Sequence, residues 1–272
     1  MKRFLLFVCL LAPLAGTAAE DTLRVDNLVV DQVLVYGAVE VEINQGEPTL
    51  LLARGDKQRL QQQPFFVEGT TLVLGKSQND TRAEINTSQL QFKLTLPVLK
   101  SVQLIGSGDV YIKPLQVGDL AIALEGSGDM KFFAVRGRNI KVAATGSGDI
   151  QLAELAAESL TLVQAGSGDL VMGKLAVAEL SASLNGSGDI KLDGAASAVK
   201  AELNIVGSGD IDFAALDADT AVVNIVGSGT GSLGESSRIV ASIMGSGEIY
   251  YRGTPAIEKT VLGSGGLHRQ HQ

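Results

Sequence analysis

Residues 106–125 read GSGDVYIKPLQVGDLAIALE, and the two segments that follow, 126–145 and 146–165, open with the same four letters. Gly-Ser-Gly occurs nine times in all, at intervals of 20, 20, 20, 20, 21, 20, 18 and 18 residues, with the last copy at 263–265. Such an interval is typical of repeat proteins, in which each repeat packs against its two neighbours in sequence. The repeat therefore decides the fold.

The apolar residues keep a constant phase within each repeat. In the first repeat they show the period-two pattern of β-strands, at Val110, Ile112, Leu115, Leu120, Ile122 and Leu124. We expect each repeat to have a strand with two inward residues, one isolated inward residue and a strand with three inward residues. Ile122 and Leu162 should therefore point into the core, whereas Ala123 and Thr161 should not.

Two all-β architectures can use this pattern. An antiparallel meander would place a hairpin at every turn, whereas a parallel β-solenoid would stack its coils about 4.8 Å apart with equivalent residues in register. Three apolar clusters of unequal length favour three sides around one core, so the predicted fold is a parallel β-helix with about 20 residues per coil. The single 21-residue interval indicates one extra residue at a corner, because the apolar phase resumes at Ala201.

The glycines of the motif are predicted to be structural. A sharp corner needs positive φ angles, which glycine adopts without steric cost, and stacked corners leave no room for a Cβ atom. The serine and aspartate side chains are expected to bond the amides of their own turn. The predicted corner glycines are Gly106, Gly108, Gly126, Gly128, Gly146, Gly148, Gly166, Gly168, Gly186, Gly188, Gly207, Gly209, Gly227, Gly229, Gly245 and Gly247.

Residues 20–100 lack the motif but contain strand-like segments, for example 39–43 and 91–96. We expect irregular first coils and a strand-rich cap there, because the ends of a solenoid must be protected against edge-to-edge pairing. Regular coils should follow over residues 101–266, continuous with the cap in one domain, and residues 267–272 should form a polar tail.

Residues 1–19 have the pattern of a signal peptide. Lys2 and Arg3 precede an apolar run over residues 4–14, and small residues then lead to a cleavage site that we place after Ala19. The apolar run is shorter than the roughly 20 residues of a transmembrane helix, so we predict export to the periplasm or the cell exterior without membrane insertion. Cys9 is the only cysteine, and its loss with this segment would leave no thiol for a disulfide, a nucleophile or a zinc site.

Charge and composition argue against several classes of partner. Without Lys2 and Arg3, 20 basic and 30 acidic residues remain, which is a formal net charge of −10. This charge opposes binding to nucleic acid and to anionic lipid headgroups. Tryptophan is absent and aromatic residues make up 4%, so platforms for stacking sugars or bases are scarce. We expect no cofactor, and a protein or glycan surface as the partner.

The fourth position of the motif is the sharpest candidate for chemistry. Stacked carboxylates could hold Ca²⁺, which takes several oxygen ligands, but aspartates that face solvent at turns are the commoner case. The corner also recurs with Thr230, Glu248 and Gly266, so it does not need a carboxylate. We therefore predict a structural ladder without metal, formed by Asp109, Asp129, Asp149, Asp169, Asp189 and Asp210.

No other constellation predicts catalysis, so we expect a protein that is not an enzyme. The acids follow the repeat without a singular cluster of the kind that acid-base chemistry requires. His268 and His271 lie in the predicted tail, where a frayed terminus is expected instead of a metal site. The triplet at 54–56, Arg-Gly-Asp, is interpreted as a turn, and Tyr250 to Arg252 as ordinary residues of a terminal strand.

The chain resembles the head GIN domain family of auto-transporter adhesins. The resemblance rests on the strand-rich start, on Leu96-Pro97-Val98-Leu99 before the first motif, on the serial Gly-Ser-Gly corners and on the ending at residues 245–255, GSGEIYYRGTP. It spans roughly residues 29–266 and implies an exported bacterial β-helix with an adhesive role and no assigned catalytic residues. We find no segment with the pattern of a C-terminal membrane barrel or a passenger linker, so we do not expect a complete auto-transporter.

Three functional hypotheses follow. The first is an exported, non-enzymatic binding or adhesion module of the bacterial cell envelope that uses an extended face. The second is a periplasmic structural or accessory protein that binds a partner protein through a patch on the N-terminal segment. The third is a carbohydrate-active β-helix enzyme, which would place a singular group of acids in a groove.

Overall fold

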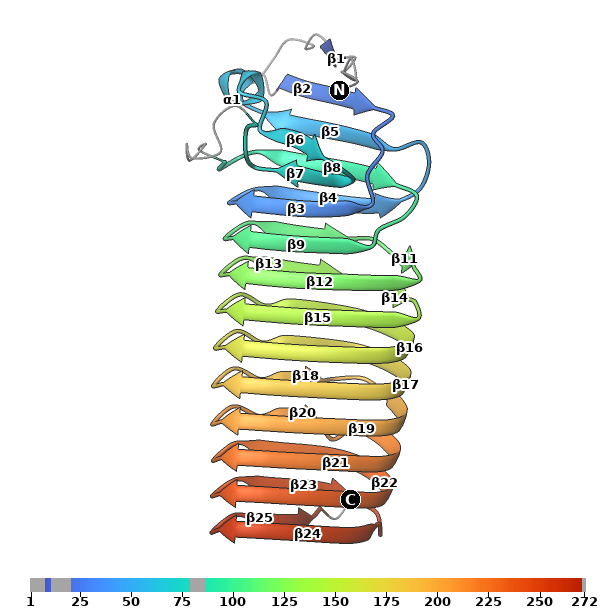
Figure 1. Cartoon of the computed structure of the whole chain (residues 1–272), viewed down its shortest axis with the longest axis vertical. Helices are drawn as coiled ribbons and strands as arrows, with labels where there is room; N and C mark the ends of the chain where they lie inside the picture. Colours follow the sequence, from blue (N-terminus) through green and yellow to red (C-terminus); the bar gives the residue numbers. More distant parts are fainter. Residues whose placement is uncertain (1–7, 11–20, 79–86, 271–272) are drawn as a thin grey trace.

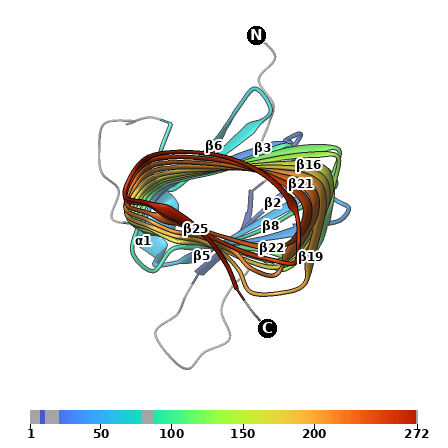
Figure 2. The same ribbon diagram turned by 90° about the horizontal axis from the view of Figure 1, so that it is seen from below.

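The computed structural model describes residues 8–10, 21–78 and 87–270. The chain forms a β-solenoid of about eight turns, nearly all of it strand, with the cap at one end and the last coil at the other (Figure 1). The end view shows an oval cross-section that is nearly constant along the solenoid (Figure 2). The prediction of an all-β parallel solenoid is confirmed.

The first coil consists of β3 (Gln32–Gly37) and β4 (Glu40–Gln45). It does not lie at the end of the solenoid, because the segment that follows turns back and adds a further layer above it. In that layer β7 pairs with β3, and β8 pairs with β4, in parallel. The strands β5, β2, β1 and β6 then add antiparallel pairings beyond them. The bounds of these elements are β1 (Val8–Leu10), β2 (Asp21–Asp26), β5 (Leu50–Gly55), α1 (Lys57–Gln61), β6 (Phe65–Glu68), β7 (Thr71–Leu74) and β8 (Gln91–Leu96).

The regular coils begin with β9, which pairs in parallel below β3, while β10 pairs below β4. Every later coil pairs in parallel with the coil before it, so a hairpin meander is excluded for this region. The first regular strands are β9 (Ser101–Gly106), β10 (Asp109–Ile112), β11 (Leu115–Gln116), β12 (Asp119–Gly126), β13 (Asp129–Phe132), β14 (Val135–Arg136) and β15 (Asn139–Gly146). Each coil here has the predicted long strand and two shorter ones.

Further along the chain, successive sides of a coil merge into continuous bent strands. The remaining strands are β16 (Ile150–Gly166), β17 (Leu170–Gly186), β18 (Ile190–Leu192), β19 (Ala196–Gly207), β20 (Ile211–Phe213), β21 (Leu216–Gly227), β22 (Thr230–Gly245), β23 (Glu248–Arg252), β24 (Ala256–Gly263) and β25 (Gly266–Arg269). Strand β25 pairs with β23, so residues 267–269, which we expected in a polar tail, belong to the last coil. Within the described residues, no helix has the length and hydrophobicity needed to cross a bilayer.

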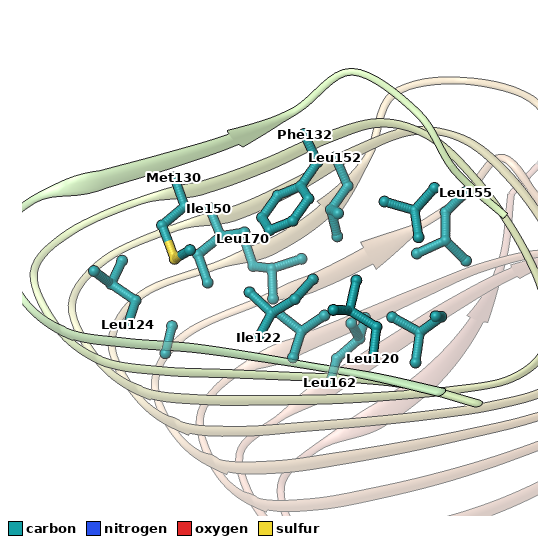
Figure 3. Packing of buried hydrophobic residues seen from close by; sticks show 14 of the residues in the cluster. Leu120, Ile122, Leu124, Met130, Phe132, Ile150, Leu152, Leu155, Leu162 and Leu170 are labelled. Atoms are coloured by element: carbon teal, nitrogen blue, oxygen red, sulfur yellow. The ribbon is translucent and has the colours of Figure 1, made fainter. Parts of the chain in front are cut away.

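The core fills the oval with the residues that the apolar phase predicted (Figure 3). Ile122 and Leu162 are buried, whereas Ala123 and Thr161 are partly exposed, which confirms the assignment of inward and outward positions. One inward position breaks the apolar rule, because Gln164 is fully buried and lies between Ala144 and Leu184 of the adjacent coils. Its Nε2 donates to the carbonyl of Gly168 at 2.7 Å, and its Oε1 has no partner.

The irregular intervals change the corners and leave the stacking intact. The extra residue of the 21-residue interval lies between Leu192 and Ala196, as Met172 pairs with Leu192 and Leu175 with Ala196. In the first 18-residue interval, Leu233 pairs with Phe213 and Ser236 pairs with Ala218. Two residues therefore lie between Leu233 and Ser236, whereas four lie between their partners in the coil above. This shorter coil has no counterpart of the inward Leu216, so the side of the solenoid is indented there.

Candidate functional site

Both glycines of each corner are confined by the neighbouring coil, and the first has a further constraint. The first glycine has a positive φ, for example 119° at Gly146, a backbone conformation that other residues rarely adopt. A Cβ atom on Gly146 would also lie 2.2 Å from the carbonyl oxygen of Gly126, and a Cβ atom on Gly148 would lie 2.0 Å from the carbonyl oxygen of Gly128. The same collision recurs at the equivalent glycine of most coils, since the corners stack backbone on backbone.

The aspartates of the motif bond the next coil. The Oδ1 of Asp129 accepts from the backbone amide of Asp149 at 3.0 Å, and Asp149 accepts in the same way from Asp169 at 2.8 Å. Three further bonds of this kind continue to Thr230. The expectation that each side chain bonds its own turn is therefore wrong for these aspartates, because in-register stacking brings the next amide within reach.

The two ends of this ladder differ from its middle. The amide of Asp129 donates to the carbonyl of Gly108 and not to the Asp109 side chain. After Thr230 and Glu248, which replace aspartate, the next amides again donate to glycine carbonyls, at Gly229 and Gly247. A carboxylate thus substitutes for a backbone acceptor in the middle coils only.

The ladder carries no sign of a metal site. In the part of the chain that the structure describes, no group of three or more His, Cys, Asp or Glu side chains is arranged to hold a metal ion. Lys191 lies beside the ladder instead, with its Nζ 2.9 Å from Asp189 and 3.9 Å from Asp169. The hydrogen bond to Asp189 and the nearby carboxylates raise the pKa of Lys191. A cation of the protein therefore offsets part of the negative charge here.

The last coil orders a residue that we expected to fray. His268 in β25 lies 2.6 Å from Glu248 and tilts against the Tyr250 ring, with ring centroids 5.4 Å apart. His268 therefore contacts two side chains of the preceding coil. His271 lies outside the described residues. The Arg-Gly-Asp triplet is part of the cap, where Asp56 caps α1 by accepting from the amide of Gln58 at 2.9 Å.

A groove lies where the shorter coils indent the side of the solenoid. Its volume is about 630 Å³, and its lining includes Asp217, Asp219, Glu235 and Arg269. Asp217 accepts from the amide of Glu235 at 3.1 Å, so one of the three carboxylates holds the backbone. The repeat pattern does not predict this group of acids, because the three carboxylates come together only when the 18-residue intervals are aligned with the coils above.

A second feature departs from the repeat on the face made by the long strands. The residue just before the first glycine points outward, and in the last four coils it is large and apolar. The exposed fractions are 49% for Val206, 47% for Val226, 54% for Met244 and 61% for Leu262. Val226 pairs with Val206 and Met244, and Met244 pairs with Leu262, so the four side chains form one column, the apolar ladder.

The four coils before them carry polar or small residues in this column, namely Glu125, Thr145, Ala165 and Asn185. The two coils nearest the cap carry Tyr36 and Ile105 there, and both are partly buried. The neighbouring outward column beside the apolar ladder is uncharged, with Asn224 donating to Asn204 at 2.8 Å. Exposed apolar side chains gathered in one place mark interaction sites more often than single ones do. The signal was present in the sequence, but only as a comparison of one outward position across coils.

The comparisons with known proteins agree with this architecture. A family model described as "Putative auto-transporter adhesin, head GIN domain" matches residues 31–154 and 141–255. The chain belongs to this family. The resemblance stated from the sequence is thereby confirmed. Among curated proteins, no match is found.

Two solved structures similar to this head GIN chain come from Parabacteroides species. A "Putative lipid binding protein" from Parabacteroides distasonis has 25% identity and a TM-score of 0.69, over 94% of this chain and 98% of that one. A "putative adhesin" from Parabacteroides merdae has 20% identity and a TM-score of 0.69, over the same shares of the two chains. The second shows the shared fold alone. The family and these neighbours are described as adhesins or lipid-binding proteins, and not as enzymes.

Proposed function

We propose that the protein is an exported, non-enzymatic binding module of the bacterial cell envelope, and that its contact surface is the long-strand face around the apolar ladder. The observation that carries this proposal is the ladder itself. Four consecutive coils expose large apolar side chains at a position that is polar or small in the four coils before them. Contact of these side chains with water is unfavourable, and they add nothing to the packing of the core. A partner that covers them explains their presence.

The alternative of a periplasmic accessory protein predicts a patch on the N-terminal segment. Of the exposed large apolar residues there, Val29 and Val98 are outside the strands, and no in-register column comparable to the apolar ladder joins them among the described residues. The ladder therefore favours the module with an extended face.

The experiment compares beads coated with the exported protein for retention on envelopes of the native host under flow. Wild-type beads should be retained, and beads with the Val226→Lys/Met244→Lys protein should wash off. Beads with Thr145→Lys/Asn185→Lys, which adds the same charge in the same column of earlier coils, should behave as wild type. Equal retention of all three proteins, or of wild-type and uncoated beads, would overturn the proposal.

A second candidate, glycan binding, is favoured by the polar groove. Carboxylates and hydroxyls of its lining, with Asp219 and Ser237 among them, suit a ligand rich in hydroxyl donors. The groove supports a glycan as the partner, and a carbohydrate-active enzyme would need its acids in such a groove. A glycan array should then show binding that Asp219→Ala abolishes while the ladder variants keep it, and an array without any bound glycan would dismiss this candidate.

A further inference from the structure

The apolar ladder is periodic, and its period restricts what can cover it. Its four side chains stand on adjacent hydrogen-bonded strands, which lie about 4.8 Å apart. A rigid surface that fills the gaps between them must present apolar groups at the same spacing. Another stacked β-sheet has this spacing, and the ladder of a second copy has it with matching side chains at Val206, Val226, Met244 and Leu262.

Charge directs copies of the chain towards the same surface. Without the predicted signal peptide the formal net charge is −10, so copies repel each other over most of their surface. Around the ladder this repulsion is weak, because the acids of the same face, Glu202 and Glu258, are matched in number by Lys200 and Arg238. The column beside it carries Asn204, Asn224, Ser242 and Thr260, which are uncharged. Two such faces can approach without opposing like charges along the ladder.

We propose that the partner of the apolar ladder is a second copy of this chain, bound face to face through the two ladders. Two sheets that pack in this way interdigitate their side chains about 10 Å apart. This inference rests on the proposed function, because it names the partner of the same surface. It makes the module homophilic, so that copies on two envelopes, or on one, adhere to each other.

The size of the surface sets the strength of the contact. Four coils spaced about 4.8 Å apart, each with about 20 Å of strand length on this face, give an area of roughly 400 Å² per copy. The total of roughly 800 Å² is below the 1,200 Å² or so of stable complexes. The dimer is therefore weak in solution, and it becomes effective when many copies face each other on surfaces, where linked contacts reinforce one another.

The test is sedimentation velocity of the exported protein over a concentration series from about 1 µM to about 1 mM, the range in which a weak complex changes its population. The wild-type mass should rise towards that of a dimer. Val226→Lys/Met244→Lys should remain monomeric, and Thr145→Lys/Asn185→Lys should dimerise as wild type does. Circular dichroism melts verify folding, and Val226→Ser/Met244→Ser replaces the lysine variant if that variant melts early.

Two outcomes would overturn the inference. A wild-type protein that stays monomeric throughout, or ladder and control variants that dimerise equally, removes the second copy as the partner. A monomer that floats with phosphatidylcholine vesicles in a ladder-dependent manner assigns the face to lipid instead. Retention of beads on envelopes by a monomeric protein would leave the proposed function standing while this inference fails.

Discussion

At the scale of single residues, both glycines of a corner allow a carbonyl of the coil above to approach, and the first also provides a positive φ. A methyl group at the second position cannot be accommodated by a rotation of its own side chain, because the atom it meets belongs to the backbone. The whole corner must move, and the corners above and below are in the same stack.

We expect Gly148→Ala to destabilise the protein by about 1–3 kcal/mol, as overpacking does in a dense interior. Gly118→Ala is the matched control, since a Cβ atom there meets nothing within 4 Å and its φ is not positive. Urea denaturation of the two variants provides the comparison. Equal stability of Gly148→Ala and wild type would show that the stacked corners are looser than the structure indicates.

The aspartate ladder leads to a second prediction at this scale. Asp149→Ala removes the acceptor of the Asp169 amide and should cost about 1.5–3 kcal/mol, the range for a hydrogen bond to a charged group. Asp149→Asn retains an oxygen and removes a charge, so it should be close to neutral. The melting temperature of the wild-type protein should be the same with calcium and with a chelator. A melting temperature that falls in chelator would restore the calcium hypothesis.

At the scale of elements, ion pairs join neighbouring coils across the outer surface. Lys100, just before β9, places its Nζ 2.6 Å from Asp31, just before β3. Its hydrogen bond lowers the pKa of Asp31 below the ordinary value of 3.8. Arg138 lowers the pKa of Asp119 in the same way, one coil away. Each of these exposed ion pairs adds little to the stability, but the pairs match the register that the strands impose.

Lys100→Met should lower the stability at pH 7 by about 1 kcal/mol or less. Because the folded-state pKa of Asp31 is depressed, this contribution is complete above pH 3.8 and is lost as the pH falls through the folded-state value. The difference from wild type in urea denaturation should therefore shrink towards pH 2. A difference that is as large at pH 2 as at pH 7 would show that the lysine acts through packing. Lys200→Met, at an exposed lysine, is the control.

At the scale of the whole molecule, the solenoid is a one-dimensional stack in which each coil contacts the next. The cap breaks this order, because β3 and β4 are covered by strands that come later in the chain. The antiparallel strands beyond them end the parallel stack at that side (Figure 1). Stability should then be close to a sum over coils and their interfaces.

Deletion of residues 146–165, one full repeat, should leave a folded protein with a cooperative melt. The cut joins Thr145 to Gly166 and restores the register of every column. Deletion of residues 146–155 should unfold the chain or cause aggregation, since half a coil rotates the apolar side chains out of the core. Circular dichroism and size-exclusion chromatography compare the two. Similar behaviour of both proteins would contradict the coil as the unit of stability.

The sequence by itself determined the coil length, the strand phase and the positions of the corners. A single coil leaves the strand phase ambiguous, but the repeats all indicate the same phase. The inward assignment of Leu162 is supported by apolar residues at the equivalent position of the other coils. The glycines could be assigned to corners for the same reason. What the pattern could not show is that the first glycine has both constraints and the second only the close approach, since each constraint alone excludes a side chain.

Only the tertiary structure decided which groups meet between coils. The carboxylate of Asp129 bonds the amide of Asp149 because stacking places residues 20 apart in sequence at adjacent strand positions. The groove at Asp217 and the apolar ladder arise likewise from columns, and a column exists only after the chain has coiled. The sequence indicated a strand-rich cap but not its pairing, because its strands return out of order and no repeat indicates where a non-repeating strand will pair.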